Sequence, residues 1–298
     1  MKSTNLFSPR RLLCLAIASL AAVSFVSRAF AAPKKALVVT VTKGFRHSSI
    51  PTAEKVLGEL AEKSGAFTVD YVRTDDELAQ KMTAEALKNY DGVIFANTTG
   101  ELPLPDKEAF MEWLKSGKAF IGMHSAADTF HPFPPYREML GAEFETHHAQ
   151  AQVDCINQDP TNPACRQLGP IFHVKDEIYL MKNFERSKVH GLLGLDKHPA
   201  DNSPEGNAQT PGDYPIAWVK EYGKGRVFYT SLGHREDIWD PNTPENFKRE
   251  NPKSVSEAYQ QHILGGIRWA LRLDESVGKA EPTVPPFILK KKISQQNE

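Results

Sequence analysis

The amino-acid sequence predicts an α/β fold of three layers: a doubly wound, mostly parallel sheet between two layers of helices, with β-rich insertions. The first observation is alternation, because short runs of β-forming residues and segments with helically spaced apolar residues follow one another from residue 36 to residue 123. The second is the run at 36–41, which has the apolar character typical of a strand buried on both faces. Repeated strand–helix units of this length indicate a parallel sheet covered on both faces.

The elements of this first half can be assigned in order. Four strands are predicted, at 36–41, 67–72, 92–96 and 119–123. Three helices are predicted between them, at 52–60, 83–88 and 105–114. Pro51 and Pro105 stand where the first and last of these helices begin, and proline suits the first turn of a helix because that turn needs no N–H donor.

The second half is less regular. Residues 149–213 carry short β-like pieces and a stretch rich in Pro, Gly and Asn, and we predict loops and edge strands added to the core. Strands at 215–219 and 225–230 are expected to form a β-hairpin. A helix at 254–273 closes the domain, which we place at 32–274, and residues 275–298 form a proline-containing tail.

The N-terminus has the three parts of a secretory signal peptide. Lys2, Arg10 and Arg11 precede an apolar run at 12–26, and Ala-Phe-Ala at 29–31 matches a cleavage site. The apolar run is shorter than the roughly 20 residues that a membrane-spanning helix needs. We therefore predict that residues 1–31 are removed, that no membrane span remains, and that the protein is periplasmic or secreted. The arginine pair leaves Sec and twin-arginine export both open.

Charge and cysteine usage agree with export. Four of the 36 basic residues and none of the 37 acidic residues lie in the first 31 positions, so the mature chain carries a net charge near −5. No basic run remains to follow a phosphate backbone, which excludes nucleic acid as a partner. Cys14 leaves with the signal, and Cys155 and Cys165 are predicted to form a disulfide in an oxidising compartment. A metal-binding or catalytic role for the two thiols is the alternative.

Ligands of parallel α/β sheets bind at the carboxyl ends of the strands, so the loops there are the candidates for a site. The first loop reads Gly-Phe-Arg-His-Ser-Ser at 44–49 and precedes a helix. A glycine allows a sharp turn, and the first residues of a helix present free N–H groups. Arg46 and His47 are therefore candidate site residues. Helix capping by Ser48 or Ser49 is the alternative role of the segment.

The second loop, Gly-Met-His-Ser-Ala-Ala-Asp at 122–128, has the composition of a nucleophile elbow. Its apex would be His124, and a histidine there disfavours covalent acyl chemistry. A following helix N-terminus keeps the imidazole neutral, which suits a metal ligand or a general base. Ser125 and Asp128 would lie beside it. A structural histidine in a polar turn is the alternative.

The third loop, Gly-His-Arg-Glu-Asp at 233–237, displays His234 in the same way after a strand. Two imidazoles presented alike are expected to converge on one cleft, where Glu236 or Asp237 could orient a ring. An exposed charge is the alternative for both acids. Trp239 could stack on a sugar ring, although such aromatic residues often only pack.

His147 and His148 are adjacent, so at most one can point into a cleft from a strand. We include His148 as a third candidate metal ligand. The sequence has no Walker-type loop and no Gly-x-Gly-x-x-Gly motif, so no nucleotide cofactor is expected.

Together these segments resemble the ThuA-like (trehalose utilisation) family over about residues 35–273. The matching stretches are 44–50 (GFRHSSI), 122–130 (GMHSAADTF), 140–144 (LGAEF) leading to His147 and His148, 176–179 (DEIY), 225–234 (GRVFYTSLGH) and 266–271 (GIRWAL). Ile178 departs from the tryptophan expected there. The family is similar in fold to class I glutamine amidotransferases, a flavodoxin-like architecture. His124 would replace the elbow cysteine of those enzymes, which argues against glutamine hydrolysis.

The resemblance implies carbohydrate metabolism on 3-keto-glycosides, with a small sugar or glycoside as the partner. A ketone at C3 acidifies the C2 proton, so that a base can remove it and the C1 substituent can leave. The hypothesis assigns catalysis to His47, His124 and His234 and a divalent metal, zinc or manganese, to His124, His234 and His148. The candidate substrate-binding residues are Arg46, Ser125, Asp128, Glu236 and Trp239. Two alternatives are a non-catalytic carbohydrate-binding protein and a metal-dependent esterase or amidase of the cell envelope.

Overall fold

The fold is described by a computed structural model for residues 1, 32–199, 213–243 and 246–274. The predicted signal peptide, apart from Met1, and the predicted tail at 275–298 lie outside these residues. Within the described part, no helix has the length and apolar character needed to cross a membrane.

A mixed sheet of nine strands among the described residues forms the centre of the fold. Its order is β2-β1-β3-β4-β11-β10-β9-β6-β7. In chain order the strands are β1 (Lys34–Val39), β2 (Phe67–Val72), β3 (Gly92–Ala96), β4 (Ala119–Met123), β6 (Ala151–Asn157), β7 (Ile171–Asp176), β9 (His190–Leu195), β10 (Tyr214–Tyr222) and β11 (Gly225–Thr230). The first five strands of the order run parallel, and β10, β9, β6 and β7 pair antiparallel. A separate antiparallel pair joins β5 (Glu143–His147) to β8 (Tyr179–Lys182).

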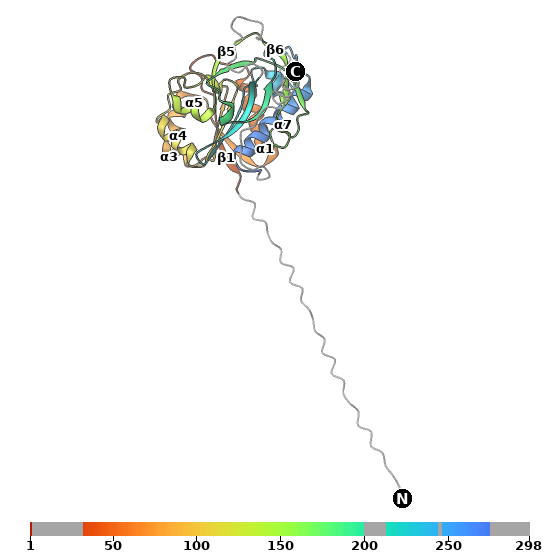
Figure 1. Cartoon of the computed structure of the whole chain (residues 1–298). Helices are drawn as coiled ribbons and strands as arrows, with labels where there is room; N and C mark the ends of the chain where they lie inside the picture. Colours follow the sequence, from red (N-terminus) through yellow and green to blue (C-terminus); the bar gives the residue numbers. More distant parts are fainter. Residues whose placement is uncertain (2–31, 200–212, 244–245, 275–298) are drawn as a thin grey trace. The chain divides into compact units, whose positions relative to one another are not determined.

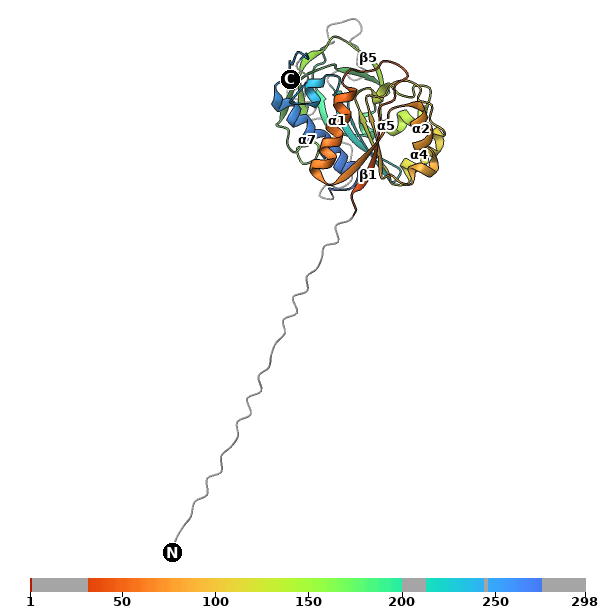
Figure 2. The same cartoon turned by 180° about the vertical axis from the view of Figure 1, so that it is seen from behind.

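Helices cover both faces of the sheet. In chain order they are α1 (Ile50–Ser64), α2 (Asp75–Lys81), α3 (Ala84–Leu87), α4 (Lys107–Lys115), the 3₁₀ helix η1 (His124–Asp128), α5 (Pro134–Leu140), the 3₁₀ helix η2 (Arg186–Lys188), α6 (Glu236–Trp239) and α7 (Lys253–Ala270). Helices α1 and α7 lie on one face, and α3, α4 and α5 lie on the other (Figures 1 and 2). Each face has its own apolar core, so the doubly wound three-layer architecture predicted from the sequence is confirmed.

The two cores follow from the apolar spacing of the helices. Leu57 of α1 and Ile263 of α7 belong to one core, and Phe110 of α4 and Met139 of α5 belong to the other, all fully buried. The strands between them are buried on both faces, as β3 and β4 show along their whole length. This burial explains why their sequences read as continuous apolar runs rather than as alternating ones.

The structure adds detail that the sequence patterns did not give. Helix α2 was not predicted, because its first turn is acidic rather than apolar; Thr74 caps it by accepting a hydrogen bond from the N–H of Glu77. The region at 149–213 contributes more than edge pieces, since β6, β7 and β9 extend the main sheet. The predicted hairpin is present as β10 and β11, and β11 pairs parallel with β4. This pairing brings the loops after β4 and β11 side by side.

Candidate active site

Three histidines meet where β1, β4 and β11 end. His47 lies in the loop between β1 and α1, His124 is the first residue of η1, and His234 follows β11. The ring centroids of His47 and His124 are 4.7 Å apart, those of His47 and His234 5.1 Å, and those of His124 and His234 5.4 Å. The structure therefore brings together the three histidines that the sequence proposed, in one cluster.

The backbone fixes the tautomer of His124. Its ring is fully buried, and its Nδ1 lies 2.8 Å from the carbonyl oxygen of Ser231. Because a carbonyl oxygen only accepts hydrogen bonds, Nδ1 carries the proton and Nε2 presents a lone pair to the cluster. His124 also has a φ of 48°, a left-handed conformation that is uncommon outside glycine and is often found at functional sites.

Two residues that the sequence did not single out complete the surroundings of His124 Nε2. The hydroxyl of Tyr179, at the start of β8, lies 2.9 Å away, and Oε2 of Glu177, just after β7, lies 3.5 Å away. His47 Nε2 lies 3.1 Å from the same nitrogen. The stretch Asp-Glu-Ile-Tyr at 176–179 belonged to the family resemblance, and that was the signal that could have identified both residues.

Glu177 is the charge centre of the cluster. Its Oε2 lies 3.2 Å from His234 Nδ1, and its Oε1 lies 3.1 Å from His147 Nδ1. Burial opposes the charge of this carboxylate, but the close imidazoles of His124 and His234 outweigh burial and hold the pKa of Glu177 below its ordinary value. One carboxylate therefore serves several imidazoles.

The histidines differ in protonation. Burial, together with the neighbouring His124 and His234, lowers the pKa of His47 to about 3. Burial also acts to lower the pKa of His234, but the nearby carboxylate of Glu177 outweighs burial, so the pKa of His234 is raised. At neutral pH His47 is an uncharged ligand or acceptor, and His234 is the ring that takes up a proton more readily.

A tightly held turn positions His234. The carboxylate of the fully buried Asp176 accepts the N–H of Gly233 at 2.7 Å and the N–H of Arg235 at 3.3 Å. The carbonyl oxygen of Gly233 accepts from Asn97 Nδ2 at 3.0 Å and from Trp239 Nε1 at 2.8 Å. Gly233 has a φ of 129°, which only glycine adopts readily, so the turn depends on this residue.

The cluster has a donor set that fits a divalent metal. One donor atom from each of His47, His124, Glu177 and His234 can be chosen so that all lie within 4.8 Å of one another. Three of the donor separations are 3.1, 3.2 and 3.5 Å, and a tetrahedral zinc ion holds its donors about 3.3–3.4 Å apart. Nitrogen and carboxylate donors suit zinc or manganese.

Two further observations point to a cation. Within the described residues, the buried Nδ1 of His234 has no hydrogen bond of good geometry. Ser125 Oγ lies 3.3 Å from Nδ1 of His47 and can accept its proton. The Nε2 lone pairs of His47 and His124 would then face each other at 3.1 Å, and a cation between them would be bound by both.

The other predicted substrate contacts lie at different distances from the cluster. Arg46 is exposed, and its guanidinium donates to the carbonyl oxygen of Thr40 at 2.9 Å. Asp128 accepts from His131 Nε2 at 2.7 Å rather than facing the cluster. Glu236 is half-buried in the first turn of α6, and Asp237 forms a buried ion pair with Arg235 instead of orienting an imidazole.

Three predictions are wrong. His147, the last residue of β5, reaches Glu177, whereas His148 lies just after the strand and is not among the clustered donors. Trp239 is fully buried, packs on Tyr259 and donates to Gly233, so its ring offers no face to a sugar. The expected disulfide is absent: Cys155 and Cys165 are free thiols in the apolar core, and Sγ of Cys165 contacts the carbonyl oxygen of Leu192 at 3.6 Å. Burial raises the pKa of both thiols, which leaves them protonated.

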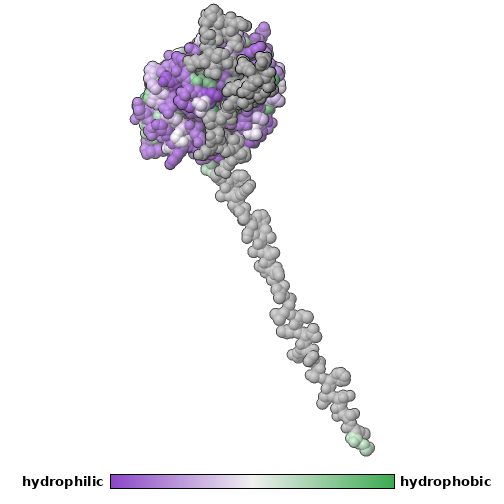
Figure 3. Space-filling view, viewed as in Figure 1, coloured by the Kyte–Doolittle hydropathy of each residue, from purple (hydrophilic) through white to green (hydrophobic). Residues whose placement is uncertain are grey.

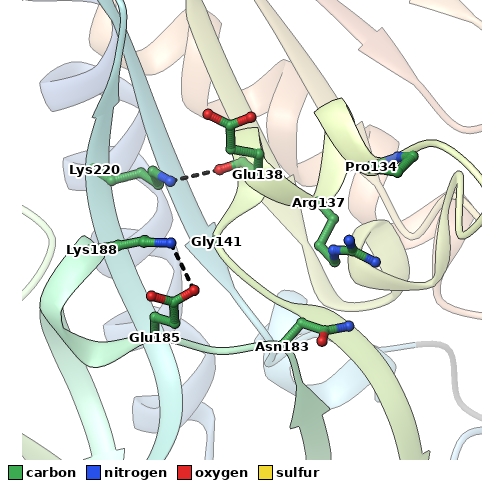
Figure 4. Close-up of a pocket in the computed structure, with 8 residues that line it drawn as sticks. All are labelled: Pro134, Arg137, Glu138, Gly141, Asn183, Glu185, Lys188 and Lys220. Carbon is green, nitrogen blue, oxygen red and sulfur yellow. Dashed lines mark hydrogen bonds and ion pairs between the residues drawn. The ribbon is translucent and has the colours of Figure 1, made fainter.

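A cavity of about 300 Å³ between α5, η2 and β10 shares no residue with the cluster (Figure 4). The amino groups of its two lysines already have partners. Lys220 donates to the carbonyl oxygen of Glu138 at 2.6 Å, and Lys188 forms an ion pair with Glu185 at 2.7 Å. The histidine cluster is therefore the stronger candidate for chemistry.

Comparison with known proteins identifies the family that the sequence resembles. The family model ThuA, described as trehalose utilisation, matches residues 35–270. A putative ThuA-like protein from Parabacteroides merdae is 19% identical with a TM-score of 0.61, and the match covers 85% of this chain and 94% of that one. A second from Bacteroides uniformis is 22% identical with a TM-score of 0.59, covering 84% and 96%. At these identities the likeness shows the fold. No curated protein matches the sequence significantly.

Proposed function

This chain belongs to the ThuA, trehalose utilisation, family, and on that premise we propose that it is an exported enzyme acting on oxidised (3-keto) glycosides. The observation that carries the proposal is the convergence of the partly buried His234 with the buried His47, His124 and Glu177, where β1, β4, β7 and β11 end. Such a set of imidazoles and a carboxylate is suited to moving a proton or binding a metal. The elbow holds His124 rather than a nucleophilic thiol, which favours this chemistry over acyl transfer.

The four clustered residues would hold a divalent ion, zinc or manganese. When bound there, the ion would withdraw electrons from the ketone oxygen of the substrate and so acidify the neighbouring C–H bond. Two contacts position the imidazole donors for this role. The Ser231 carbonyl oxygen lies against Nδ1 of His124, and the Ser125 hydroxyl lies against Nδ1 of His47.

His147 is the base that remains when the other histidines bind metal. Its Nδ1 lies 3.1 Å from both Glu177 Oε1 and the carbonyl oxygen of His148, so Nδ1 carries a proton and Nε2 holds the lone pair. The side chain is 44% exposed, which leaves it accessible to a substrate. A carboxylate in this position fixes the tautomer and the orientation of the imidazole.

The proposed reaction is an elimination. His147 Nε2 takes the proton from C2, next to the C3 ketone; the C–H electrons form the C1–C2 double bond, and the bond from C1 to the glycosidic oxygen breaks. The departing oxygen keeps that electron pair and takes up the proton that His147 received, so the products are an unsaturated keto-sugar and a free alcohol. Addition of water to C1 would convert the same step into a net hydrolysis.

Metal content and turnover of the mature protein test the proposal together. We expect one divalent ion per chain in the wild type and its loss in His124→Ala and His234→Ala, with conversion of a methyl 3-keto-glucoside reduced about 100-fold or more. His173→Ala is the matched control, because this histidine is 66% exposed and pairs with Asp154 away from the cluster.

Other outcomes would redirect the assignment. Turnover of the 3-keto-glucoside at the wild-type rate by His124→Ala would refute it. Sugar binding without turnover would favour a binding protein. Hydrolysis of simple esters with sensitivity to chelators would favour an envelope esterase.

A further inference from the structure

Phe45 is a solvent-exposed apolar side chain beside the histidine cluster. It is 67% exposed, and among the described residues the only other large hydrophobic side chains exposed are Met1 and Ile171. The face of the molecule in Figure 3 is mainly hydrophilic where it is coloured. Single exposed hydrophobic residues are common on protein surfaces, so the position and rigidity of Phe45 decide whether it has a role.

The loop that carries Phe45 is rigidly attached. The N–H of Lys43 donates to the carbonyl oxygen of Thr99 at 2.8 Å, and the N–H of Gly44 donates to Thr99 Oγ1 at 3.1 Å. Thr99 Oγ1 donates in turn to the carbonyl oxygen of Phe45 at 2.9 Å. Gly100, with a φ of 76°, lets the two loops approach closely, since a Cβ there would lie 3.1 Å from the backbone of Gly44. The ring is therefore held exposed by its backbone and is not simply on a loose loop.

The ring also touches the cluster directly. Its centroid lies 4.8 Å from that of His47, with the planes at 80°, an edge-to-face contact. His47 in turn meets His124 and His234. A ring fixed at the exposed border of a buried polar cluster offers an apolar surface to any molecule that reaches the cluster.

We propose that Phe45 is the platform on which the sugar ring of the substrate lies, and that it favours pyranosides whose hydroxyl groups are equatorial. This inference rests on the proposed function. In such a ring the carbon-bound hydrogens point to the two faces, so each face is apolar while the rim is polar. Phenylalanine has no polar group and packs on that face without requiring a hydrogen bond. An axial hydroxyl would project into the aromatic ring and lose its hydrogen bonds to water.

Stacking on Phe45 would act on binding rather than on the chemical step. The platform lies beside His47 but contributes no donor atom to the cluster, so its removal should raise KM and leave kcat nearly unchanged. Arg46, the next residue, and Ser48, which follows the buried His47, are also exposed and could bind the polar rim of the sugar.

The test compares Phe45→Ala and Phe45→Trp with the wild type on methyl 3-keto-glucoside. We expect Phe45→Ala to raise KM about three- to tenfold with kcat within about twofold, and Phe45→Trp to restore KM. The preference for glucoside over galactoside, whose 4-hydroxyl is axial, should shrink in Phe45→Ala. Ile171→Ala is the control, since it removes a comparable exposed side chain on β7.

The outcomes separate this inference from the proposed function. If the wild type converts the keto-glucoside and Phe45→Ala does so with the same KM, the platform is wrong and the proposed function stands. If saturation-transfer NMR finds neither binding nor conversion of any of these glycosides by the metal-loaded wild type, both are wrong.

Discussion

Two groups of histidines and carboxylates in this protein use the same residue types in opposite proportions. In the buried cluster, the single carboxylate of Glu177 lies near His124, His147 and His234. In the second group, the single imidazole of His131 lies between two carboxylates, 2.7 Å from Asp128 and 2.9 Å from Glu143. The first arrangement leaves ring nitrogens with free lone pairs, and the second engages both nitrogens of its ring.

This difference separates the proposed active site from a group of ion pairs. Burial lowers the pKa of His131, but hydrogen bonds to Asp128 and Glu143 outweigh burial, so the pKa of His131 is raised. An imidazole whose two ring nitrogens both face carboxylates presents no free nitrogen to a metal. The two groups therefore differ in the number of carboxylates for each imidazole, not in residue type.

The largest effect is expected when Glu177, the carboxylate that lies near three histidines, is replaced. Glu177→Gln should abolish metal binding and lower kcat/KM about 100-fold or more, because a neutral amide neither balances the charge of the ion nor orients His147 as an acceptor. Glu143→Gln is the matched control, since Glu143 is equally buried but serves His131, Arg137 and Lys182. Equal losses in the two variants would show that general destabilisation, not the cluster, governs activity.

A smaller effect concerns the turn that presents His234. Asp176→Asn keeps one acceptor oxygen and places an amide N–H₂ against backbone N–H groups, so we expect a loss of about 1–3 kcal/mol in the free energy of unfolding. His234 would then be less well fixed, and kcat should fall about tenfold while metal is retained. Urea unfolding and steady-state kinetics measure the two effects. Unchanged kcat in a destabilised variant would assign Asp176 to stability alone.

Sequence patterns predicted the parallel half of the fold closely and the site partly. The strands at 67–72, 92–96 and 119–123 were predicted with the bounds that the structure gives, because apolar runs bounded by turns specify buried strands locally. His47, His124 and His234 were found because each follows a predicted strand, at 36–41, 119–123 and 225–230 respectively. Glu177, Tyr179 and His147 come from the insertions, where the contacts depend on pairings distant in the sequence, such as β5 with β8. The buried state of Trp239 likewise depends on α7, which no local pattern reveals.

The smallest expected effect is on the pH dependence of the free energy of unfolding, which should differ between His131 and the buried cluster. The folded pKa of His131 is raised, so its contribution to stability is fully present below the unfolded value of about 6.5 and is lost as the pH rises through the folded value. His131→Gln should therefore lower the free energy of unfolding by about 0.5–1 kcal/mol at pH 6 and by less at pH 9, a small change because the ring is 33% exposed.

His47 should show the opposite sign. Its folded pKa is about 3, so between pH 6.5 and 3 the unfolded chain binds a proton that the folded chain does not, and acid destabilises the metal-free protein. His47→Gln removes this term, and its unfolding free energy should fall less steeply than that of the wild type between pH 6 and 4. Urea unfolding of the metal-free proteins across this range measures both slopes. A wild-type slope matched by His47→Gln would mean that His47 titrates like an exposed histidine, and that burial in the cluster does not keep its ring uncharged in acid.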